Sequence, residues 1–438
     1  MNITFVTTQL PPLHGGAGNS VQIMTESITR FSKHTVSILM PEPPGSYGQA
    51  VMEYFKKNLG KRSSSISLEF LPSLSSSSWK IKMFGLSLEN IAGILPHHTE
   101  NNLDSYFQKA NPDLIVVMDP NGLAGIPHVF GHGRLPGLDY ARKNNIPIIG
   151  YYFAHYIAAV KYYNPLFRLL HVEGLIKFLT RKILNQCDHV LLFSEKIQAQ
   201  LIESGVKRVS TTWAEGLQLE RFKRMEKTGT KKFQKPSIVF TGRLMREKNV
   251  HQICDIVLKL HQINRNFQVV IIGSGPEKKA MEKKLRPLGN VAFHEWMKQE
   301  DLFSILAKSH IYINCTDFET LGLSIAEAMF FGVVPVVFHH GGHTRFVDHG
   351  ISGILCKNEG DYLFYLNYLL THPEVAAVMG AEARKQILDK LDINRNIPKF
   401  ISVLEFFQKT HFAPENANMP VQREVLPGTF FSTREKPG

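Results

Sequence analysis

Residues 317–329 read DFETLGLSIAEAM and follow a short apolar run at Ile311–Asn314. The segment has the composition of a turn that opens into a helix. The backbone N–H groups in the first turn of a helix have no acceptor within the helix, so they form a binding site for anions such as a diphosphate. The N–H groups that we expect to form this site belong to Gly322, Leu323 and Ser324.

Two carboxylates flank this turn. Glu319 precedes it, and Glu327 lies inside the helix, so the two acids are well separated along a bound ligand. This spacing predicts a pair that accepts hydrogen bonds from hydroxyl groups at both ends of one sugar-containing molecule. The alternative is an acidic residue favoured by the helix dipole and an exposed helical glutamate. The apolar neighbours of Glu327 make that alternative costly, because a buried carboxylate needs partners.

Two other turns in this half follow apolar runs. Residues 239–248 place Arg243 and Lys248 just past a strand-like run, where both can reach one anion, although plain surface charge is the alternative. Residues 271–277 read IIGSGPE, and glycine lets the backbone approach a ligand closely. An ordinary strand-to-helix turn also contains such glycines. The candidate glycines are Gly242, Gly273 and Gly275.

Short apolar runs alternate with helix-like segments along the whole chain. Runs that are apolar on both faces and separated by helices predict parallel sheets covered by helices on both sides. In such sheets, ligands bind beyond the carboxyl ends of the strands. The Ser-rich stretch 63–78 is expected to be a loop. The runs interpreted as strands are Asn2–Thr7, Thr35–Met40, Leu114–Met118, Pro147–Phe153, His189–Phe193, Ser237–Thr241, Gln268–Ile272, Ile311–Asn314 and Val333–Phe338.

The alternation occurs twice and predicts two domains. We expect an N-terminal, acceptor-side Rossmann-like domain at 1–215, a linker at 216–236 and a C-terminal donor domain at 237–390. A terminal helix at 391–410 is expected to pack back on the first domain, and 411–438 to form a flexible tail.

Composition narrows the class of protein. The chain has 438 residues, 43% hydrophobic content and a net charge of +12, which favours an anionic partner such as a nucleotide diphosphate, a phospholipid surface or a nucleic acid. A basic solvated surface without a partner is the alternative. We see neither a signal peptide nor an apolar run of the roughly 20 residues that a spanning helix needs. The scattered cysteines favour buried free thiols in a cytoplasmic protein: Cys187, Cys254, Cys315 and Cys356.

Taken together, these motifs resemble the donor site of the family 4 glycosyltransferases, also called group 1. The shared pattern comprises Gly-Arg…Glu-Lys at 242–248, Gly-Ser-Gly-Pro at 273–276 and Glu-x7-Glu at 319–327, and it continues through 333–353. The resemblance covers nearly all of residues 237–390. It implies an α/β fold of the GT-B type, in which two Rossmann-like parallel-sheet domains face each other across a cleft.

The resemblance also implies roles for the candidate residues. Arg243 and Lys248 would bind the donor diphosphate, and Glu319 with the N–H groups at Gly322 would hold the donor sugar and phosphate. Glu327 would bind the ribose hydroxyl groups. The turn that contains Met297 would face the nucleotide base.

The likeness extends more loosely into the first half. Gly15 and Gly16 follow the first apolar run, where the family has a Gly-rich loop beside donor and acceptor; a simple flexible turn is the alternative. His155 ends another run and resembles the histidine that family members place near the reacting sugar. A structural role for a single histidine is the alternative.

The family implies a retaining hexosyltransferase that works without a metal or other cofactor, with a UDP- or GDP-sugar as donor. The phosphate oxygen would take the proton of the acceptor. Lipid, lipid-linked and saccharide acceptors remain open. Residues 79–86 alternate aromatic, apolar and basic side chains, which suggests peripheral attachment to an anionic membrane on its cytoplasmic face.

Three alternatives remain at this point. A non-catalytic nucleotide-sugar-binding protein could share the fold, although the retained acids and cations favour an enzyme. A Rossmann dehydrogenase lacks support, because the glycines after the first run do not have the GxGxxG spacing. A nucleic-acid binder would explain the charge but not the paired glutamates, and we find no known DNA- or RNA-binding module.

Overall fold

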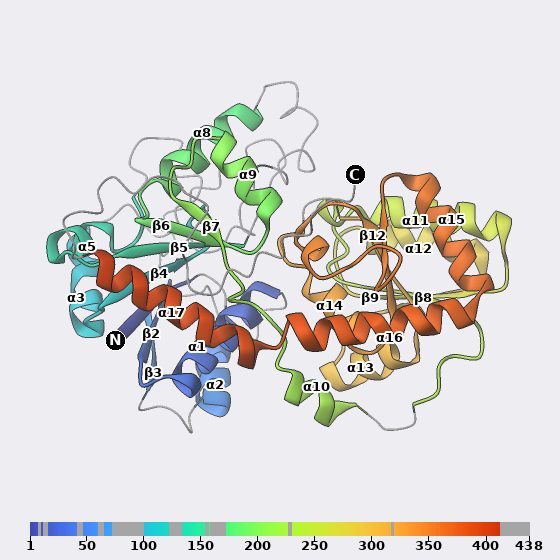
Figure 1. Ribbon diagram of the computed structural model, residues 1–438, viewed down its shortest axis with the longest axis horizontal. Coiled ribbons are helices and arrows are strands. Elements are labelled where there is room, and N and C mark those ends of the chain that lie inside the picture. Colours follow the sequence, from blue (N-terminus) through green and yellow to red (C-terminus); the bar gives the residue numbers. More distant parts are fainter. Residues whose placement is uncertain are drawn as a thin grey trace, which may run out of the picture. The chain divides into compact units, whose positions relative to one another are not determined.

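The computed structural model of the chain contains two compact units (Figure 1). Unit 1 comprises Met1–Ala154, Leu175–Glu215 and Asn394–Gly438, and unit 2 comprises His155–Gly174 and Gly216–Ile393. The residues that the structure describes are 1–7, 10–11, 16–41, 47–59, 65–71, 100–121, 134–153, 157, 172–226, 230–316 and 319–411.

Unit 1 is built on a sheet of seven described strands, all parallel, in the order β3-β2-β1-β4-β5-β6-β7. Its central strand β4 is fully buried because helices cover both faces of such a sheet. The strands are β1 Asn2–Val6, β2 Thr35–Pro41, β3 Ile66–Leu71, β4 Leu114–Met118, β5 Ile148–Tyr152, β6 His189–Leu192 and β7 Val209–Thr211. The helices between them are α1 Gly16–Phe31, α2 Tyr47–Leu59, α3 Glu100–Ala110, α5 Leu138–Asn144, α8 Val172–Leu184 and α9 Glu195–Glu203.

Unit 2 repeats this architecture with six described parallel strands in the order β10-β9-β8-β11-β12-β13. The strands are β8 Ser237–Thr241, β9 Gln268–Ile272, β10 Val291–His294, β11 Ile311–Asn314, β12 Val334–Phe338 and β13 Ile354–Cys356. The α-helices are α10 Leu219–Met225, α11 Val250–Ile263, α12 Lys278–Leu285, α13 Gln299–Lys308, α14 Leu323–Phe330, α15 Glu359–Thr371 and α16 Pro373–Lys390. Short 3-10 helices are η5 Arg246–Lys248, η6 Arg286–Leu288 and η7 Gly342–Arg345.

The last helix, α17 (Ile393–His411), packs on unit 1 rather than on the unit that precedes it in sequence. Phe400 is completely buried, and its ring meets the ring of Tyr151 edge-on at 6.0 Å between centroids. Five residues further along the helix, the carboxylate of Glu405 lies 2.8 Å from Nε2 of His34. Unit 1 therefore contains the first and the last described segments of the chain.

Unit 2 has a dense apolar core between its sheet and the helices on it. Tyr362 of α15 is completely buried, and its hydroxyl shares its one hydrogen between the carbonyl oxygens of Asn314 (2.5 Å) and Val336 (2.8 Å). These two carbonyls belong to the neighbouring strands β11 and β12. The buried hydroxyl is thus satisfied while it ties a helix to the strands that carry the candidate site.

The predicted fold class is confirmed, and so is the prediction of buried free cysteines. One prediction was wrong: the stretch 63–78 is not entirely a loop. Ile66–Leu71 forms β3, which pairs with β2 in the register Val36↔Ile66. The serines around this strand hid it, but Ile66 and Leu71 are both buried against the sheet. The stretch predicted as a linker also contains a helix, α10.

Candidate active site at the carboxyl edge of the second sheet

The topology of unit 2 collects the predicted donor residues at one edge. All its strand pairs are parallel, so the loops after β8, β9, β10, β11 and β12 leave from the same edge of the sheet. The strand order also reverses between β8 and β11, because β9 and β10 extend the sheet to one side and β12 and β13 to the other. Ligands of open parallel sheets bind at such a switch point.

An ion pair joins the two loops at this switch point. The Nζ atom of Lys248, which follows β8, lies 2.6 Å from Oε1 of Glu319, which follows β11. The two side chains are only 20% and 13% exposed, so the pair is largely shielded from solvent. A lysine ammonium has three N–H donors. This contact uses one of them, and a bound anion can take the others.

Lys248 holds Glu319 in its charged form. Burial by itself raises the pKa of the Glu319 carboxyl, and the nearby Lys248 cation is the main group that opposes this effect. A hydrogen bond from Asn314 also favours the carboxylate, and the net result is a pKa below the ordinary value for glutamate. The pair therefore presents a fixed anion and a fixed cation side by side at neutral pH.

Asn249 fixes the position of Lys248. It adopts a left-handed backbone conformation (φ 49°), which asparagine tolerates better than most residues, and this ends η5 directly after the lysine. Its side-chain amide donates to the carbonyl oxygen of Cys315 at 2.9 Å. The loop after β8 is thus bound to the residue that follows β11, and the cation is held in place without a ligand.

The N-terminus of α14 lies in the same loop as Glu319. Gly322 caps the helix with φ 89°, a conformation that favours glycine. No described residue accepts a hydrogen bond from the backbone N–H groups of Gly322, Leu323 or Ser324. The hydroxyl of Ser324 is 2.9 Å from the buried Tyr312 hydroxyl, which holds this side chain against the strand. The three N–H groups are therefore available to an anion.

The glycines after β8 and β9 have a structural role that sequence reasoning did not identify. The N–H of Gly242 donates to the carbonyl of Ile272, and the N–H of Leu244 donates to the carbonyl of Ser274. A Cβ atom on Gly273 would lie less than 3.0 Å from the carbonyl oxygen of Gly242. Gly273 is thus required because two backbones pack against each other, whether or not a ligand also approaches.

Gly275 is required for the same reason, since a Cβ there would lie less than 3.0 Å from the carbonyl oxygen of Leu244. The turn after β12 packs just as closely against the loop that contains Glu319. The N–H of Gly342 donates to the carbonyl of Glu319 at 2.6 Å, and a Cβ on Gly342 would collide with the carbonyl of Thr320. Backbone contacts between adjacent turns therefore shape the whole edge.

Arg243 lies at this edge but is less constrained than Lys248. Its side chain is 51% exposed, and its guanidinium is 3.7 Å from the carboxylate of Glu247, which is almost buried. Arg246 turns instead to Glu277, at 3.0 Å. Convergence of Arg243 and Lys248 on one anion stays a prediction, because each cation has a carboxylate partner of its own.

Glu327 lies on α14, in the second turn of the helix. Among the described residues it makes neither a hydrogen bond nor an ion pair. Burial raises the pKa of its carboxyl to about 7, and the positive charge of Arg221 only partly opposes this. A half-buried acid without a partner is costly unless a ligand satisfies it. A hydroxyl-binding role for Glu327 stays a prediction, and the structure does not bring Glu327 to the Lys248–Glu319 pair.

The remaining predicted residues are less informative. Met297 is half-buried in the loop after the edge strand β10, at the same edge as the other donor candidates. Gly16 is the first residue of α1. Gly15, His155 and the basic aromatic stretch 79–86 lie outside the described residues.

Two residues at these edges were missed from the sequence. His343 is 1% exposed; its Nε2–H donates to the carbonyl of Phe338, and its Nδ1 has no partner among the described residues. Burial lowers the pKa of His343 to about 4, so the ring is neutral and fixes the Gly-Gly turn beside Glu319. In unit 1, Asp119 follows β4 with a strained φ of 57° and is buried at that sheet's switch point. For Asp119, a polar residue directly after an apolar run was the available signal, whereas His343 lies five residues beyond the end of β12 and offered none.

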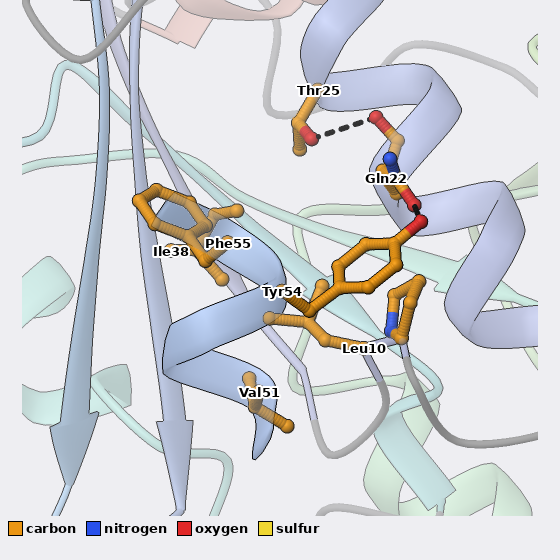
Figure 2. A pocket seen from close by; sticks show the side chains of 8 residues that line it. Leu10, Gln22, Thr25, Ile38, Val51, Tyr54 and Phe55 are labelled. Atoms are coloured by element: carbon orange, nitrogen blue, oxygen red, sulfur yellow. Dashed lines mark hydrogen bonds between the residues drawn. The ribbon is translucent and has the colours of Figure 1, made fainter. Parts of the chain in front are cut away.

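Unit 1 contains a small cavity between α1, α2 and β2 (Figure 2). Tyr54 and Gln22 meet at one end, where the tyrosine hydroxyl donates to the glutamine Oε1 at 3.0 Å. The enclosed volume of about 10 Å³ accommodates about one water molecule, so no sugar or nucleotide fits. The walls are Leu10, Pro11, Gln22, Thr25, Ile38, Val51, Tyr54 and Phe55.

No three His, Cys, Asp or Glu side chains of the described residues gather closely enough to share a metal ion. Within the same residues, every helix is too short or too polar to traverse a lipid bilayer.

Part of the second unit is similar to one family of known proteins. Residues 222–386 match the family model of the glycosyl transferases group 1. The chain is 26% identical over 297 residues to the sulfoquinovosyl transferase SQD2 of Arabidopsis thaliana. The aligned stretch covers 64% of this chain and 54% of that protein. It is 22% identical over 275 residues to an alpha-monoglucosyldiacylglycerol synthase of Acholeplasma laidlawii. This alignment covers 58% of this chain and 68% of that protein. The match thus spans about half the length of the first relative and two thirds of the second.

Solved structures resemble this chain over most of its length. HepE of Anabaena, in complex with UDP and glucose, superposes with a TM-score of 0.63 at 17% identity over 92% of this chain and 99% of HepE. A sucrose-phosphate synthase of Thermosynechococcus elongatus gives a TM-score of 0.68 at 14% identity, over 93% and 99% of the two chains. These likenesses confirm the GT-B fold of two Rossmann-like units.

Proposed function

We propose that this chain is a retaining glycosyltransferase that transfers a sugar from a nucleotide-sugar to a lipid or saccharide acceptor without a metal ion. The observation that carries the proposal is the Lys248–Glu319 pair at the switch point of unit 2, beside the open N–H groups of α14. The family match at residues 222–386 supports it. Because HepE was solved with UDP and with UDP-glucose, a UDP-sugar is our first choice of donor over a GDP-sugar.

In the proposed reaction, the bond between the anomeric carbon and the donor phosphate breaks, and the electron pair leaves with the diphosphate. Lys248, Arg243 and the first turn of α14 stabilise the charge that develops there, as preorganised donors do in other transferases. Glu319 accepts from the hydroxyl groups of the sugar. The acceptor oxygen attacks from the face that the diphosphate leaves, and a phosphate oxygen takes its proton.

The acceptor is proposed to be a lipid because one of the relatives described above is named an alpha-monoglucosyldiacylglycerol synthase. We propose the cytoplasmic face of a membrane as the place of the reaction, with the enzyme attached to its surface.

The primary test is a thermal-shift screen of the purified chain against UDP-, GDP- and ADP-sugars. Ligand present at 100 times its Kd stabilises the folded state by about 2.7 kcal/mol, which raises the unfolding temperature by several degrees. We expect one class of nucleotide-sugar to do this, and NMR of the product to show retained configuration. Stabilisation without turnover on any acceptor would instead favour the non-catalytic nucleotide-sugar-binding alternative.

Glu327 predicts a pH dependence of donor binding. Its pKa is raised from 4.5 to about 7, so the carboxyl is largely protonated below pH 7 and charged above it. Ribose hydroxyls donate to the charged form, so the affinity for UDP-glucose should rise as pH increases through 7. The fully charged form should bind about tenfold more tightly, the value of one charged hydrogen bond. Calorimetric titration between pH 6 and pH 8.5 measures this.

The matched control for that experiment is in unit 1. Burial also raises the pKa of Glu215 to about 7, although Tyr151 opposes the shift. Glu327→Gln should remove the pH dependence, and Glu215→Gln should leave it unchanged. The reverse pattern would show that Glu327 does not bind the donor.

A further inference from the structure

The helix α8 of unit 1 exposes apolar side chains on one face. Leu175 and Phe178 are 44% and 49% exposed, and residues three apart share a helix face. Among the described residues, none has an atom within 4 Å of a Cβ placed on Gly174, one turn before Phe178. The opposite face anchors the helix through Ile183, Leu184 and Thr180, which are buried. The exposed side chains are therefore a feature of a well-packed helix.

Cations accompany these apolar side chains. Arg181 and Lys182 follow Phe178 by three and four residues and are exposed, and the guanidinium of Arg181 lies over the Phe178 ring at 5.3 Å. The one acid of this helix, Glu173, is two residues before Leu175 and so points to a different side. We call Leu175, Phe178, Arg181 and Lys182 the α8 face.

Further positive charge borders the end of the helix. The N–H of Lys207 donates to the side chain of Asn185, and the guanidinium of Arg208 donates to the carbonyl of Cys187. Both cations are exposed. Basic residues in a last helical turn also interact favourably with the helix dipole. That effect explains Arg181 and Lys182 alone, but it explains neither the exposed Leu175 and Phe178 nor the two cations outside the helix.

The position of the α8 face in unit 1 relates it to the ligand edge. Strands β5 and β6 are neighbours and parallel, so α8 between them runs in the opposite direction. Its first turns, with Leu175 and Phe178, consequently lie toward the carboxyl ends of the strands, the edge at which parallel sheets bind ligands. A surface that docks there brings its molecules to the acceptor side of the sheet.

We propose that the α8 face docks on an anionic lipid surface, with Leu175 and Phe178 inserted among the headgroups and Arg181 and Lys182 bound to lipid phosphates. Charge complementarity identifies the occupant: apolar side chains bordered by cations are the signature of an interfacial helix. The proposal of this docking surface rests on the proposed function, in which the acceptor is a lipid. It assigns membrane docking to α8 of the described chain.

The test is sedimentation of the full chain with vesicles of phosphatidylcholine containing 30% phosphatidylglycerol, and with pure phosphatidylcholine as comparison. We expect binding to the anionic vesicles that weakens with salt. Arg181→Gln together with Lys182→Gln should lower the partition coefficient about 30-fold, since each cation contributes about fivefold. Phe178→Gln should lower it about tenfold.

Unit 2 provides matched controls. Lys279 and Lys283 of α12 are exposed, so their joint replacement by glutamine lowers the net charge from +12 by the same two units. Phe364 of α15 is 64% exposed and matches Phe178. Neither control should change vesicle binding more than about twofold. Equal losses in the α8 and α12 variants, or no preference for anionic vesicles, would overturn the proposal.

The inference and the proposed function fail separately. Vesicle binding is measured without donor, and thermal stabilisation by UDP-sugars is measured without vesicles. If Phe178→Gln instead changes the oligomeric state and leaves vesicle binding intact, the α8 face is a protein interface and the lipid proposal is wrong.

Discussion

Replacing Lys248 with alanine should lower the turnover of donor by roughly 10²–10³-fold, the effect of removing one preorganised donor from a developing charge. The cation is held by Asn249 beside Glu319, so its stabilisation acts mainly as the diphosphate departs, and kcat should fall more than KM rises. The rate of UDP-sugar hydrolysis without acceptor measures this.

Arg246 supplies the matched control for that variant. It lies on the same 3-10 helix, is 65% exposed, and pairs with Glu277 rather than with Glu319. Arg246→Ala should stay within threefold of the parent rate. If Lys248→Ala also stays within threefold while the chain remains folded, Lys248 does not act on the diphosphate.

The second large effect is on stability. Gly273→Ala should cost about 4 kcal/mol or more of folding free energy in unit 2, because its Cβ would collide with the carbonyl oxygen of Gly242 and neither backbone can yield cheaply. Urea denaturation, followed by fluorescence and by circular dichroism, measures the loss. UDP-sugar binding should disappear together with the packing of the two turns.

A variant at Gly289 is the control that distinguishes the steric collision of a Cβ from the conformational strain of a residue with positive φ. It has φ 69°, but a Cβ there meets no atom of the described residues within 4 Å. Gly289→Ala should therefore cost only about 1 kcal/mol, the strain of a left-handed residue. Equal losses at the two positions would show that the turns after β8 and β9 can separate.

The sequence was sufficient for the two parallel sheets because their central strands are apolar on both faces, as in β4 and β12. It was insufficient at the edges. The strand β3 lies among serines, and β10 has alternating half-buried and exposed residues, so neither stands out as a buried run. An edge strand has a neighbouring strand on one side only and is less buried, so its sequence is less apolar and is harder to recognise as a strand.

The candidate site could likewise be predicted only in part. Arg243, Lys248, Glu319 and Glu327 were recognisable because charges directly after or beside apolar runs are unusual. The partner of each charge was not recognisable, since it depends on which loops the sheet order brings together. The glycine at 273 was assigned to a ligand, although the structure shows that backbone packing already requires it. His343 escaped notice because a single histidine has no distinctive spacing.

The path of α17 has a consequence for how the protein is made. The ribosome synthesises unit 2 in full before the segment that completes unit 1 emerges, since Phe400 and Glu405 contact Tyr151 and His34. Until α17 has been synthesised, the surface of unit 1 that this helix covers stays exposed, although unit 2 is already able to fold. Chaperone capture and aggregation at that stage, rather than the stability of the finished enzyme, are therefore expected to limit its yield.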